Sequence, residues 1–404
     1  MTWLDLPDDC PFGIETLPYG VFRQATDDPR VGVRIGEQVL DLAAVAAHIG
    51  HEHAEVLAQP SLNRLMALGP ATCGEIRSWV RSLLVEKSQR AMVSTRLLDA
   101  SDVVMQLPIE VADYVDFYAS ESHASNVGQI FRPDSPALPP NWRHLPIGYH
   151  GRAGTVVVSG TDVARPRGQR LPAPDDMPVF GPSTKLDIEC EVGFVVGQAT
   201  PLGHSVEVSD ARDYIFGVVL LNDWSARDIQ AWEYVPLGPF LGKSFATSIS
   251  AWVVPLEALD AATVPLPEQD PAPLPYLSGG HTSLFALDLR LDIAVNGQVI
   301  SSPAYRDMYW SPAQMLAHLT VNGASLRVGD LFASGTVSGS ERLTFGSLLE
   351  LSWNGNQPVQ LGNGSTRAFL EDGDVVTLTG WAPGANAGRV TLGEVMGRIV
   401  ASPD

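Results

Sequence analysis

The fold is decided by Leu186-Asp187-Ile188-Glu189-Cys190-Glu191-Val192-Gly193-Phe194-Val195-Val196, taken together with the later run Val218-Val219-Leu220-Leu221-Asn222-Asp223-Trp224-Ser225-Ala226-Arg227-Asp228-Ile229-Gln230. In the first run, β-branched and aromatic residues alternate with other residues over a short stretch, which predicts a strand. The second run is apolar until it ends abruptly at Asn222-Asp223. It predicts another strand, one whose end carries polar side chains.

The two glutamates of the first run allow two interpretations. Side chains two residues apart on a strand share a face, so Glu189 and Glu191 are expected to point the same way. With Asp223 at the end of the other strand, they could converge on a hard cation, because carboxylate oxygens are the ligands that such a cation prefers. Alternatively, the glutamates are the solvent-facing side of a half-exposed strand, and spacing alone favours this interpretation.

The composition indicates a large, β-rich chain. Its 404 residues suggest two domains, and 45% hydrophobic with 18% charged residues allow a substantial core. The 37 glycines and 31 prolines fit many turns between short strands. Runs of strands without regular helix alternation favour a mixed-β, α+β architecture over a doubly wound sheet.

The net charge and the cysteine content limit which binding partners and which cellular compartment are expected. A net charge of −20 argues against nucleic acid and against an anionic membrane surface, although a local cation or arginine cluster can still receive a small anion. Cys10, Cys73 and Cys190 form no paired framework and no Cys-X-X-Cys spacing, which fits a reducing setting. With neither a signal-like N-terminus nor a membrane-length apolar run, we expect a cytoplasmic protein.

The N-terminal part is expected to be a small β-rich domain with packing helices. Short strand-like runs punctuated by turns occupy residues 14–42. Apolar positions at three- and four-residue spacing then predict helices over residues 43–49, 62–68 and 71–98. The character of the sequence changes near residue 105, so we predict domains at 1–105 and 106–404.

Residues suited to catalysis become dense after this boundary. Asp116, Tyr118, His123 and Arg132 supply an acceptor, an amphipathic ring, a proton shuttle and an anion-binding group within seventeen residues. A surface helix that begins after Ser120 would hold several of the same residues without any chemistry. The local sequence favours this second interpretation.

Four acidic residues form the first candidate constellation: Asp116, Glu189, Glu191 and Asp223. Four carboxylates gathered without a cation would repel one another and some of their pKa values would rise. A divalent cation would remove that cost, and ligation by oxygen alone points to Ca²⁺, Mg²⁺ or Mn²⁺ rather than zinc.

A helix predicted after Asp223 forms the second constellation. Ser225 is expected to cap it, with Asp228 three residues later completing a pattern like a capping box. Arg227, Gln230 and Tyr234 would then lie on one face, where polar donors suit an oxygen-rich substrate. An ordinary solvated helix face explains the same spacing.

Two loops and one glutamate complete the candidates. The Gly-Lys-Ser at 242–244 is not a phosphate-binding loop, because Leu237 stands where that motif needs glycine, yet Lys243 could offer positive charge to a developing anion. The glycine-containing loop at 332–339 either binds a carboxylate or is a simple turn. Glu350, on a strand predicted over 348–352, either faces solvent or orients a basic partner such as histidine.

Six motifs resemble one known family, the fumarylacetoacetase (fumarylacetoacetate hydrolase) family. They are Leu17-Pro-Tyr-Gly-Val-Phe22, Asp116-Phe-Tyr-Ala-Ser-Glu-Ser-His-Ala-Ser-Asn-Val-Gly128, His144-Leu-Pro-Ile-Gly-Tyr-His-Gly-Arg152, Asn222-Asp-Trp-Ser-Ala-Arg-Asp-Ile-Gln230, Trp232-Glu-Tyr-Val-Pro-Leu-Gly-Pro-Phe-Leu-Gly-Lys-Ser-Phe245 and Ala333-Ser-Gly-Thr-Val-Ser-Gly339. The likeness spans essentially the whole chain, and the motifs are long and specific.

The resemblance implies a small SH3-like N-terminal barrel, a mixed-β C-terminal domain and a homodimer. It implies Ca²⁺ held by Asp116, Glu189, Glu191 and Asp223, and Mg²⁺ near Lys243 and Thr247 with Asp223. It implies His123 as general base oriented by Glu350, with Arg227, Gln230 and Lys243 also in catalytic roles. The implied substrate contacts are Tyr118, Arg132, Tyr149, Gln230, Tyr234, Gly335 and Thr336.

The implied reaction is hydrolysis of a carbon–carbon bond in fumarylacetoacetate, a diketo acid, to fumarate and acetoacetate, the last step of tyrosine and phenylalanine degradation. Two alternatives stay open on the sequence. One is hydrolysis of another acylpyruvate or β-diketo acid, and the other is a non-catalytic dimer stabilised by metal.

Overall fold

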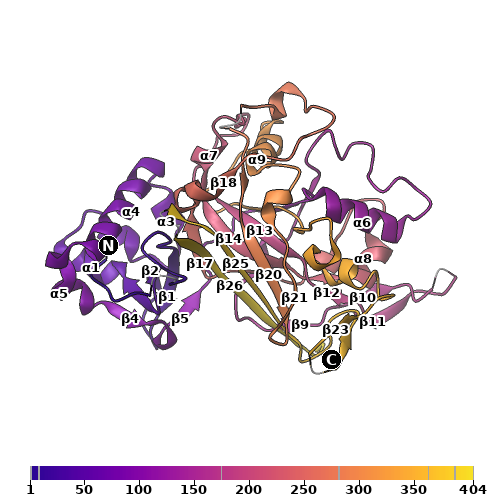
Figure 1. Cartoon of the computed structure of the whole chain (residues 1–404), viewed down its shortest axis with the longest axis horizontal. Coiled ribbons are helices and arrows are strands. Elements are labelled where there is room, and N and C mark those ends of the chain that lie inside the picture. Colours follow the sequence, from indigo (N-terminus) through magenta and orange to yellow (C-terminus); the bar gives the residue numbers. More distant parts are fainter. Residues whose placement is uncertain are drawn as a thin grey trace.

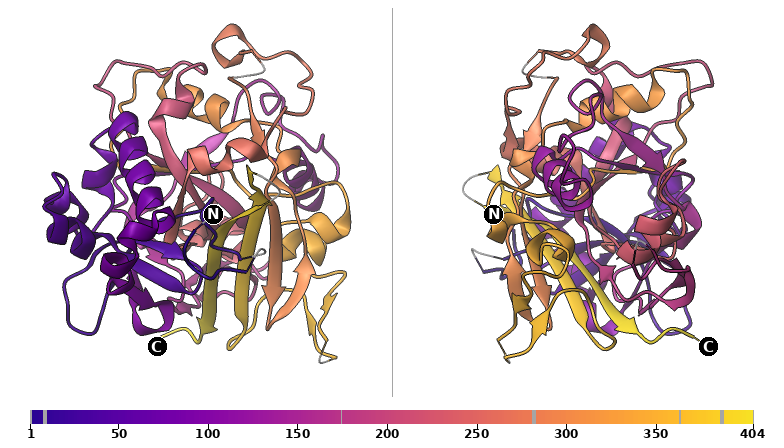
Figure 2. Two further views of the ribbon diagram at one scale, coloured as in Figure 1. Left: turned by 60° about the vertical axis from the view of Figure 1, so that its left-hand side comes forward. Right: turned by 90° about the vertical axis from the view of Figure 1, so that its right-hand side faces the viewer.

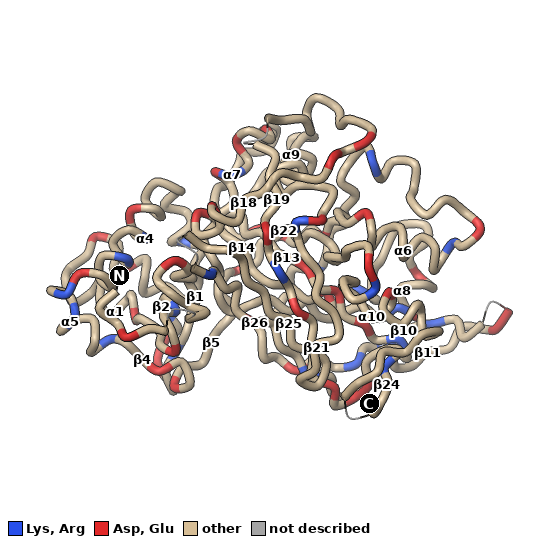
Figure 3. Tube along the Cα trace, viewed as in Figure 1, with Lys and Arg blue, Asp and Glu red and all other residues tan. Residues whose placement is uncertain are grey.

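The computed structural model describes residues 2–7, 10–173, 175–280, 283–362, 364–385 and 388–403. One thirteen-stranded sheet crosses much of this chain, in the order β4-β3-β2-β1-β17-β14-β13-β22-β6-β7, with β5, β8 and β16 paired beside that path. Figure 1 shows the N-terminal elements in indigo at one end and the large β-rich body at the other. Acidic positions are spread over the whole trace (Figure 3).

The N-terminal part of the sheet carries its own helices. Its strands are β1 (Tyr19–Arg23), β2 (Arg30–Ile35), β3 (Gln38–Asp41), β4 (Leu97–Asp99) and β5 (Val104–Gln106), and its helices are α1 (Leu42–Ile49), α2 (Ala54–Leu57), α3 (Asn63–Met66), α4 (Pro70–Val85) and α5 (Arg90–Ser94). One edge of β1 pairs with β2, and its other edge is divided between β17 and β5. Among the described residues these pairings leave the sheet open, so the expected SH3-like barrel is not closed.

The long helix predicted over residues 71–98 is wrong in its second half. Helix α4 ends at Val85, a short helix α5 follows, and the chain then enters strand β4. Strand β4 extends the sheet beyond β3, pairing Leu97 with Leu40 and Leu98 with Val39. Edge pairing of this kind overrides the helical spacing of the sequence, because tertiary contacts decide where propensity is weak.

The remainder of the large sheet positions the site. It contains β6 (Tyr114–Phe117), β7 (Gly148–His150), β8 (Val156–Val158), β13 (Cys190–Val196), β14 (Ile215–Asp223), β16 (Thr247–Ile249), β17 (Trp252–Pro255) and β22 (Leu331–Ala333). Strand β13 pairs antiparallel with both β14 and β22, and β22 pairs parallel with β6. This order brings strand ends from distant parts of the chain together.

A five-stranded sheet forms a second layer. It runs β21 (Gln298–Ser301), β20 (Arg290–Val295), β25 (Val375–Pro383), β26 (Arg389–Val400) and β9 (Val163–Ala164). Figure 2 shows its long strands, in orange and yellow, along one side of the molecule. Side chains of both sheets share one buried apolar core. The expected turn at Asn296-Gly297 is confirmed between β20 and β21, where both residues have positive φ.

Short hairpins and helices surround these layers. The two-stranded pairs are β10 (Arg167–Arg170) with β11 (Val179–Pro182), β12 (Leu186–Asp187) with β15 (Ser225–Ala226), β18 (Thr263–Val264) with β19 (Ala286–Leu287), and β23 (Val359–Gln360) with β24 (Thr366–Arg367). The helices are α6 (Glu121–Phe131), α7 (Ala211–Tyr214), α8 (Arg227–Glu233), α9 (Pro312–Thr320) and α10 (Leu348–Leu351). The mixed-β, α+β fold class is thereby confirmed.

The same elements bear on the predicted domain boundary and on whether any helix could span a membrane. The predicted boundary near residue 105 falls inside β5, and β1 joins β17 across the two parts, so the division at 1–105 and 106–404 stays a prediction. No helix in the described part of the chain combines the length and the apolar character that crossing a bilayer demands.

Candidate active site

One cavity of about 400 Å³ collects most of the residues singled out from the sequence. Its lining includes Asp116, Tyr118, His123, Arg132, Tyr149, Glu189, Glu191, Arg227, Gln230, Tyr234, Lys243, Gly335 and Thr336. Three further candidates, Asp223, Thr247 and Glu350, are buried behind this lining. Asp223 contacts Lys243, Glu350 contacts His123, and Thr247 donates to Asp223. The structure therefore brings the whole candidate set into one place.

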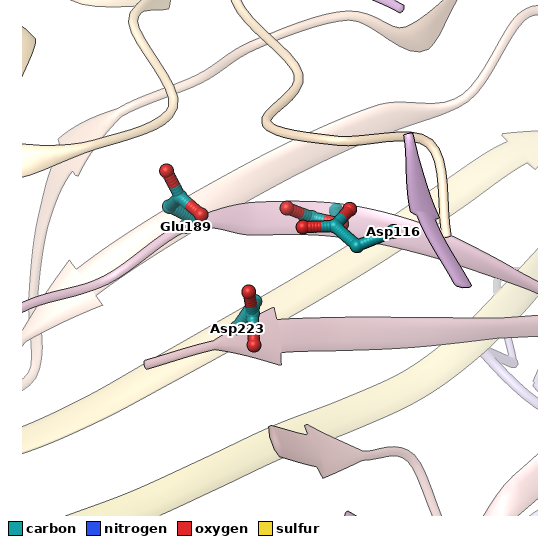
Figure 4. A group of neighbouring side chains, drawn as sticks. Asp116, Glu189 and Asp223 are labelled. Atoms are coloured by element: carbon teal, nitrogen blue, oxygen red, sulfur yellow. The ribbon is translucent and has the colours of Figure 1, made fainter. Parts of the chain in front are cut away.

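The four acidic residues meet at the ends of neighbouring strands. Asp116 lies on β6, Glu191 on β13, Asp223 at the end of β14, and Glu189 directly before β13. Each has a carboxylate oxygen within 4.8 Å of those of the others, and all four are buried. Figure 4 shows the side chains of Asp116, Glu189 and Asp223 close to one another at these strand ends. The solvent-facing interpretation of Glu189 and Glu191 is therefore wrong.

Two basic side chains compensate only part of this charge. Arg227 donates from Nη2 to Oε1 of Glu189 at 2.7 Å. The Lys243 ammonium contacts carboxylate oxygens of both Glu189 and Asp223. Asp223 also accepts from Thr247 Oγ1 at 2.8 Å. Since Arg227 is shared with a further carboxylate, at least two negative charges of the acidic group lack a basic partner.

The uncompensated oxygens fit a divalent cation. Asp116 Oδ1 and Glu191 Oε1 are buried without any hydrogen-bond partner among the described residues. Burial, and then the charge of Asp223, raise the pKa of Asp116 well above its ordinary value. Burial, and then the charge of Asp116, do the same to the pKa of Glu191. Orphaned, buried, mutually repelling carboxylates suit a hard cation with oxygen ligands.

We predict that the metal-free protein loses stability as the pH rises from about 5 to about 8. The folded-state pKa values of Asp116 and Glu191 lie above their unfolded values. Their contribution to stability is therefore fully present below the unfolded carboxyl pKa of about 4 and is lost as pH rises through the folded values. Urea unfolding of chelator-treated protein at the two pH values measures the slope.

Two controls isolate this effect from other titrating groups. Asp116→Asn should show a smaller loss of stability over the same pH range, because one of the repelling carboxylates is gone. Added Ca²⁺ should raise the free energy of unfolding most at the higher pH. A metal-free stability that rises with pH to the same extent in both proteins would contradict the prediction.

Helix α6 presents the histidine of the site. Ser120 caps this helix, and its Oγ accepts from the His123 backbone N–H at 3.2 Å, as the sequence predicted. His123 is nevertheless buried, with Nδ1 at 2.7 Å from Glu350 Oε2 and Nε2 at 3.7 Å from Glu189 Oε1. The interpretation as an ordinary surface helix is therefore wrong.

Glu350 is buried and fully hydrogen-bonded. Its Oε1 accepts from Asn126 Nδ2 at 2.9 Å, and its Oε2 accepts from Ser338 Oγ at 2.9 Å and Ser347 Oγ at 2.8 Å. Burial alone would raise the pKa of Glu350, but His123 and these donors outweigh it and hold the pKa below its ordinary value. Glu350 is thus an anion poised beside the histidine.

The strand predicted over residues 348–352 is wrong, because these residues form the short helix α10. Ser347 caps it and accepts from the Glu350 backbone N–H at 3.3 Å. The pattern Ser347-Leu-Leu-Glu350 is the signature of a capping box, so the sequence did contain a helix signal that the strand prediction missed. The supporting residues Asn126 and Ser338 carried no signal of their own role.

The predicted cap of the helix after Asp223 is also wrong. Helix α8 begins at Arg227, and its capping position, Ala226, makes no side-chain hydrogen bond. The Ser225 hydroxyl instead donates to the Asp223 carbonyl at 3.1 Å and accepts from Lys243 Nζ at 3.0 Å. The Asp228 carboxylate accepts from Ser183 Oγ at 2.6 Å and from the Thr184 backbone N–H at 2.7 Å. Competing long-range partners displace the local pattern.

The predicted polar face of this helix is confirmed. Arg227 Nη1 donates to Gln230 Oε1 at 3.2 Å, and both line the cavity. Tyr234 ends the helix, lines the cavity and is 38% exposed, so it lies toward the entrance. Tyr149, across the cavity, donates from its hydroxyl to Asp223 Oδ2 at 3.1 Å.

The loop after β22 completes the lining. Its Gly335 donates its backbone N–H to Glu191 Oε2 at 3.1 Å. Gly335 has φ of 74°, and a Cβ there would lie 2.1 Å from the Phe117 carbonyl oxygen, so only glycine fits. Thr336 Oγ1 is buried without a partner among the described residues and borders the cavity. The loop is therefore more than a simple turn.

Comparison with known proteins assigns the chain to a protein family. The descriptions "Fumarylacetoacetase N-terminal" and "Fumarylacetoacetate (FAA) hydrolase C-terminal" match residues 15–108 and 113–400. The fumarylacetoacetase of Homo sapiens is 47% identical over 416 residues, covering 99% of both chains. That of Arabidopsis thaliana is 45% identical over 417 residues, covering 100% of this chain and 99% of the relative. The chain belongs to the fumarylacetoacetase family.

Family membership confirms the resemblance carried by the sequence motifs. It also makes the chain an enzyme, a hydrolase that acts on carbon–carbon bonds. The fumarylacetoacetase family fold recurs in a fumarylacetoacetate hydrolase from Exiguobacterium antarcticum, with a TM-score of 0.56 at 15% identity over 96% of this chain and 100% of the other. A maleylpyruvate hydrolase from Sphingobium sp. SYK-6, solved with manganese and pyruvate, gives 0.53 at 16% identity, covering 96% and 100%. At such identities the likeness shows the fold alone.

Proposed function

We propose that the chain hydrolyses 4-fumarylacetoacetate to fumarate and acetoacetate, the last step of tyrosine and phenylalanine degradation. The observation that carries the proposal is the juxtaposition, in one cavity, of the His123–Glu350 pair and the acidic group of Asp116, Glu189, Glu191 and Asp223. Full-length relatives named fumarylacetoacetase, at 42–47% identity, support this substrate over other diketo acids.

His123 is the general base of this mechanism. Its Nδ1 faces the Glu350 carboxylate, so the neutral ring carries its hydrogen on Nδ1 and its lone pair on Nε2. Nε2 takes a proton from water, whose oxygen bonds to the fumaryl carbonyl carbon. Glu350 stabilises the imidazolium that forms. The carbon–carbon bond then breaks, and the proton passes from Nε2 to the enolate carbon of acetoacetate.

The acidic group is proposed to hold Ca²⁺. When bound there, the cation supplies Lewis-acid polarisation of the diketone oxygens. The second cation implied by the family, Mg²⁺ near Lys243, Thr247 and Asp223, is part of the proposal too. Lys243 can contribute to that site only through its backbone carbonyl, because its ammonium has no lone pair.

Three donors on one side of the cavity are proposed to stabilise the developing anion. Arg227 and Lys243 supply positive charge that their carboxylate partners hold in place. Gln230 accepts from Arg227 through Oε1, which leaves its amide N–H groups free to donate to the enolate oxygen. Such preorganised donors are worth most in a buried site, where water does not compete.

Arg132 and the Thr336 loop are proposed to hold a terminal carboxylate of the substrate. We predict that Arg132→Ala raises KM about 10- to 100-fold, the cost of losing one charge-assisted hydrogen bond of roughly 1.5–3 kcal/mol. Steady-state kinetics on fumarylacetoacetate measures it. Arg143, an exposed arginine paired with Glu121 on α6 outside this cavity, gives the matched control Arg143→Ala. Equal KM values for Arg132→Ala and the control would contradict the assignment.

One substrate panel tests the proposed reaction against its alternatives. Initial rates on fumarylacetoacetate should exceed those on other acylpyruvates and β-diketo acids. Faster turnover of one of those would replace the substrate. A non-catalytic, metal-stabilised protein would turn over none of them, although chelation would still lower its melting temperature.

We propose in addition that the enzyme is a cytoplasmic homodimer. Cys10, Cys73 and Cys190 are all free, as a reducing compartment requires. Leu237, which belongs to the cavity lining, is 96% exposed and Val235 is 67% exposed, and such apolar side chains suit burial against a second copy. Light scattering of the purified protein measures the mass, and a monomer at micromolar concentration would reject the dimer.

A further inference from the structure

Asp187 is a fully hydrogen-bonded carboxylate near the cavity, yet it does not line it. It ends the short strand β12, two residues before Glu189, and its side chain is 0% exposed. Neither the acidic group nor the histidine pair includes it. We propose that Asp187 is a positioning residue that holds Arg227 and helix α10 in a fixed relation, and so aligns the Arg227–Glu189 pair with the His123–Glu350 pair. This inference rests on the proposed catalytic roles of these residues.

All the accepting capacity of the Asp187 carboxylate is used. Oδ2 accepts from Arg227 Nε at 2.8 Å and from the Leu349 backbone N–H at 3.0 Å. Oδ1 accepts from the backbone N–H groups of Ile188 and Leu348, both at 2.8 Å. A carboxylate has about four lone-pair positions, so these four donors saturate it.

Helix α10 depends on this carboxylate. It has only four residues, too few to be stable on their own. Leu348 and Leu349 are its first two residues, whose N–H groups have no acceptor within the helix, and Asp187 accepts from both. Ser347 accepts from the third, that of Glu350. Loss of the Asp187 acceptors would therefore release the helix that aims Glu350 at His123.

Asp187 also fixes the orientation of the Arg227 guanidinium. Arg227 has three directed contacts, with Asp187 through Nε, with Glu189 through Nη2 and with Gln230 through Nη1. A planar guanidinium held at three edges cannot rotate. One carboxylate thus links the acidic group, the polar face of α8 and the histidine pair.

Asp187→Asn tests the proposal with the least change of shape. The amide nitrogen cannot accept, so at least two of the four hydrogen bonds are lost. We expect kcat on fumarylacetoacetate to fall about 10- to 100-fold, the usual effect of outer residues that orient a site, with a smaller rise in KM. In the double variant Asp187→Asn with Glu350→Gln, the total fall in kcat should be much smaller than the product of the two single falls. Both changes act through His123.

A matched control separates positioning from general stability. Asp41 is also buried, accepts from Arg30 Nε at 2.7 Å and caps a helix by accepting from the Ala44 N–H at 2.9 Å, but it lies in the N-terminal sheet. Asp41→Asn should lower the melting temperature and leave kcat unchanged. A kcat loss as large for Asp41→Asn as for Asp187→Asn would overturn the proposal.

Two further outcomes distinguish a failure of the Asp187 proposal from a failure of the proposed mechanism. If kcat in the double variant falls by the full product of the two single falls, the positioning role is overturned, while the proposed mechanism stands. Unchanged kcat in Glu350→Gln alone overturns the mechanism itself. Where Asp187→Asn does not fold, Asp187→Glu keeps the buried charge but displaces the carboxylate oxygens, and it is combined with Glu350→Gln in the same way. Multiplied losses there overturn the proposal equally.

Discussion

Replacing His123 by asparagine is expected to lower kcat on fumarylacetoacetate by about two to four orders of magnitude, the range supplied by a positioned general base. The asparagine amide can still donate to Glu350, in the place of Nδ1, so the buried carboxylate keeps a partner. The lone pair of Nε2 has no replacement. Stopped-flow or steady-state kinetics at saturating substrate and Ca²⁺ measures the loss.

The control for this variant is a histidine outside the cavity. His150, on β7, has a side chain that is 74% exposed and lies 3.5 Å from Asp113. His150→Asn should keep the activity of the unmodified protein. Retention of more than about a tenth of kcat by His123→Asn would contradict the assignment of the base, since even weak general-base catalysis exceeds that factor.

Replacing Asp116 by asparagine should have opposite effects on cation binding and on metal-free stability. One ligand oxygen disappears, so Ca²⁺ affinity should fall at least about a hundredfold, beyond the usual cost of losing an outer-shell partner. Without the cation the same change removes a buried charge whose Oδ1 has no hydrogen-bond partner. The metal-free variant is therefore expected to be as stable as the unmodified protein, or more stable.

Calorimetric Ca²⁺ titration and urea unfolding of the chelated protein measure the two effects. Asp113, three residues earlier, is partly exposed and outside the cavity, so Asp113→Asn is the matched control. It should leave Ca²⁺ affinity unchanged. A metal-free Asp116→Asn protein that is less stable by several kcal/mol would mean that this carboxylate is a structural partner and no ligand.

Local patterns in the sequence predicted the strands of the site but not their meeting. The runs around Glu191 and Asp223 are strands, as their β-branched and apolar residues indicated. Their adjacency depends on sheet order, in which β13 lies between β14 and β22 and Asp116 on β6 pairs with Ala333. Spacing within a strand contains no information about its neighbours, so the residues alone left the meeting of the acidic group open, and only the long family motifs favoured it.

Where the sequence failed, long-range contacts had outweighed local preference. Asp228 looked like part of a helix cap, but Ser183 and Thr184 from another segment hold it. Glu350 looked like a strand residue, but Asp187 accepts from the first N–H groups of α10 and stabilises a helix there. The sequence suggested no function for Asp187, because the residues next to it in the chain do not reveal the distant donors from which it accepts hydrogen bonds.

The most direct test of the whole account is cation-dependent turnover of fumarylacetoacetate by the purified protein. The protein is stripped with chelator and assayed for fumarate and acetoacetate while Ca²⁺ is added back. We expect almost no turnover without the cation, equal amounts of the two products as activity returns, and saturation with Ca²⁺ that is lost in Asp116→Asn. Full activity in the chelated protein, or Ca²⁺ binding without release of either product, would contradict it.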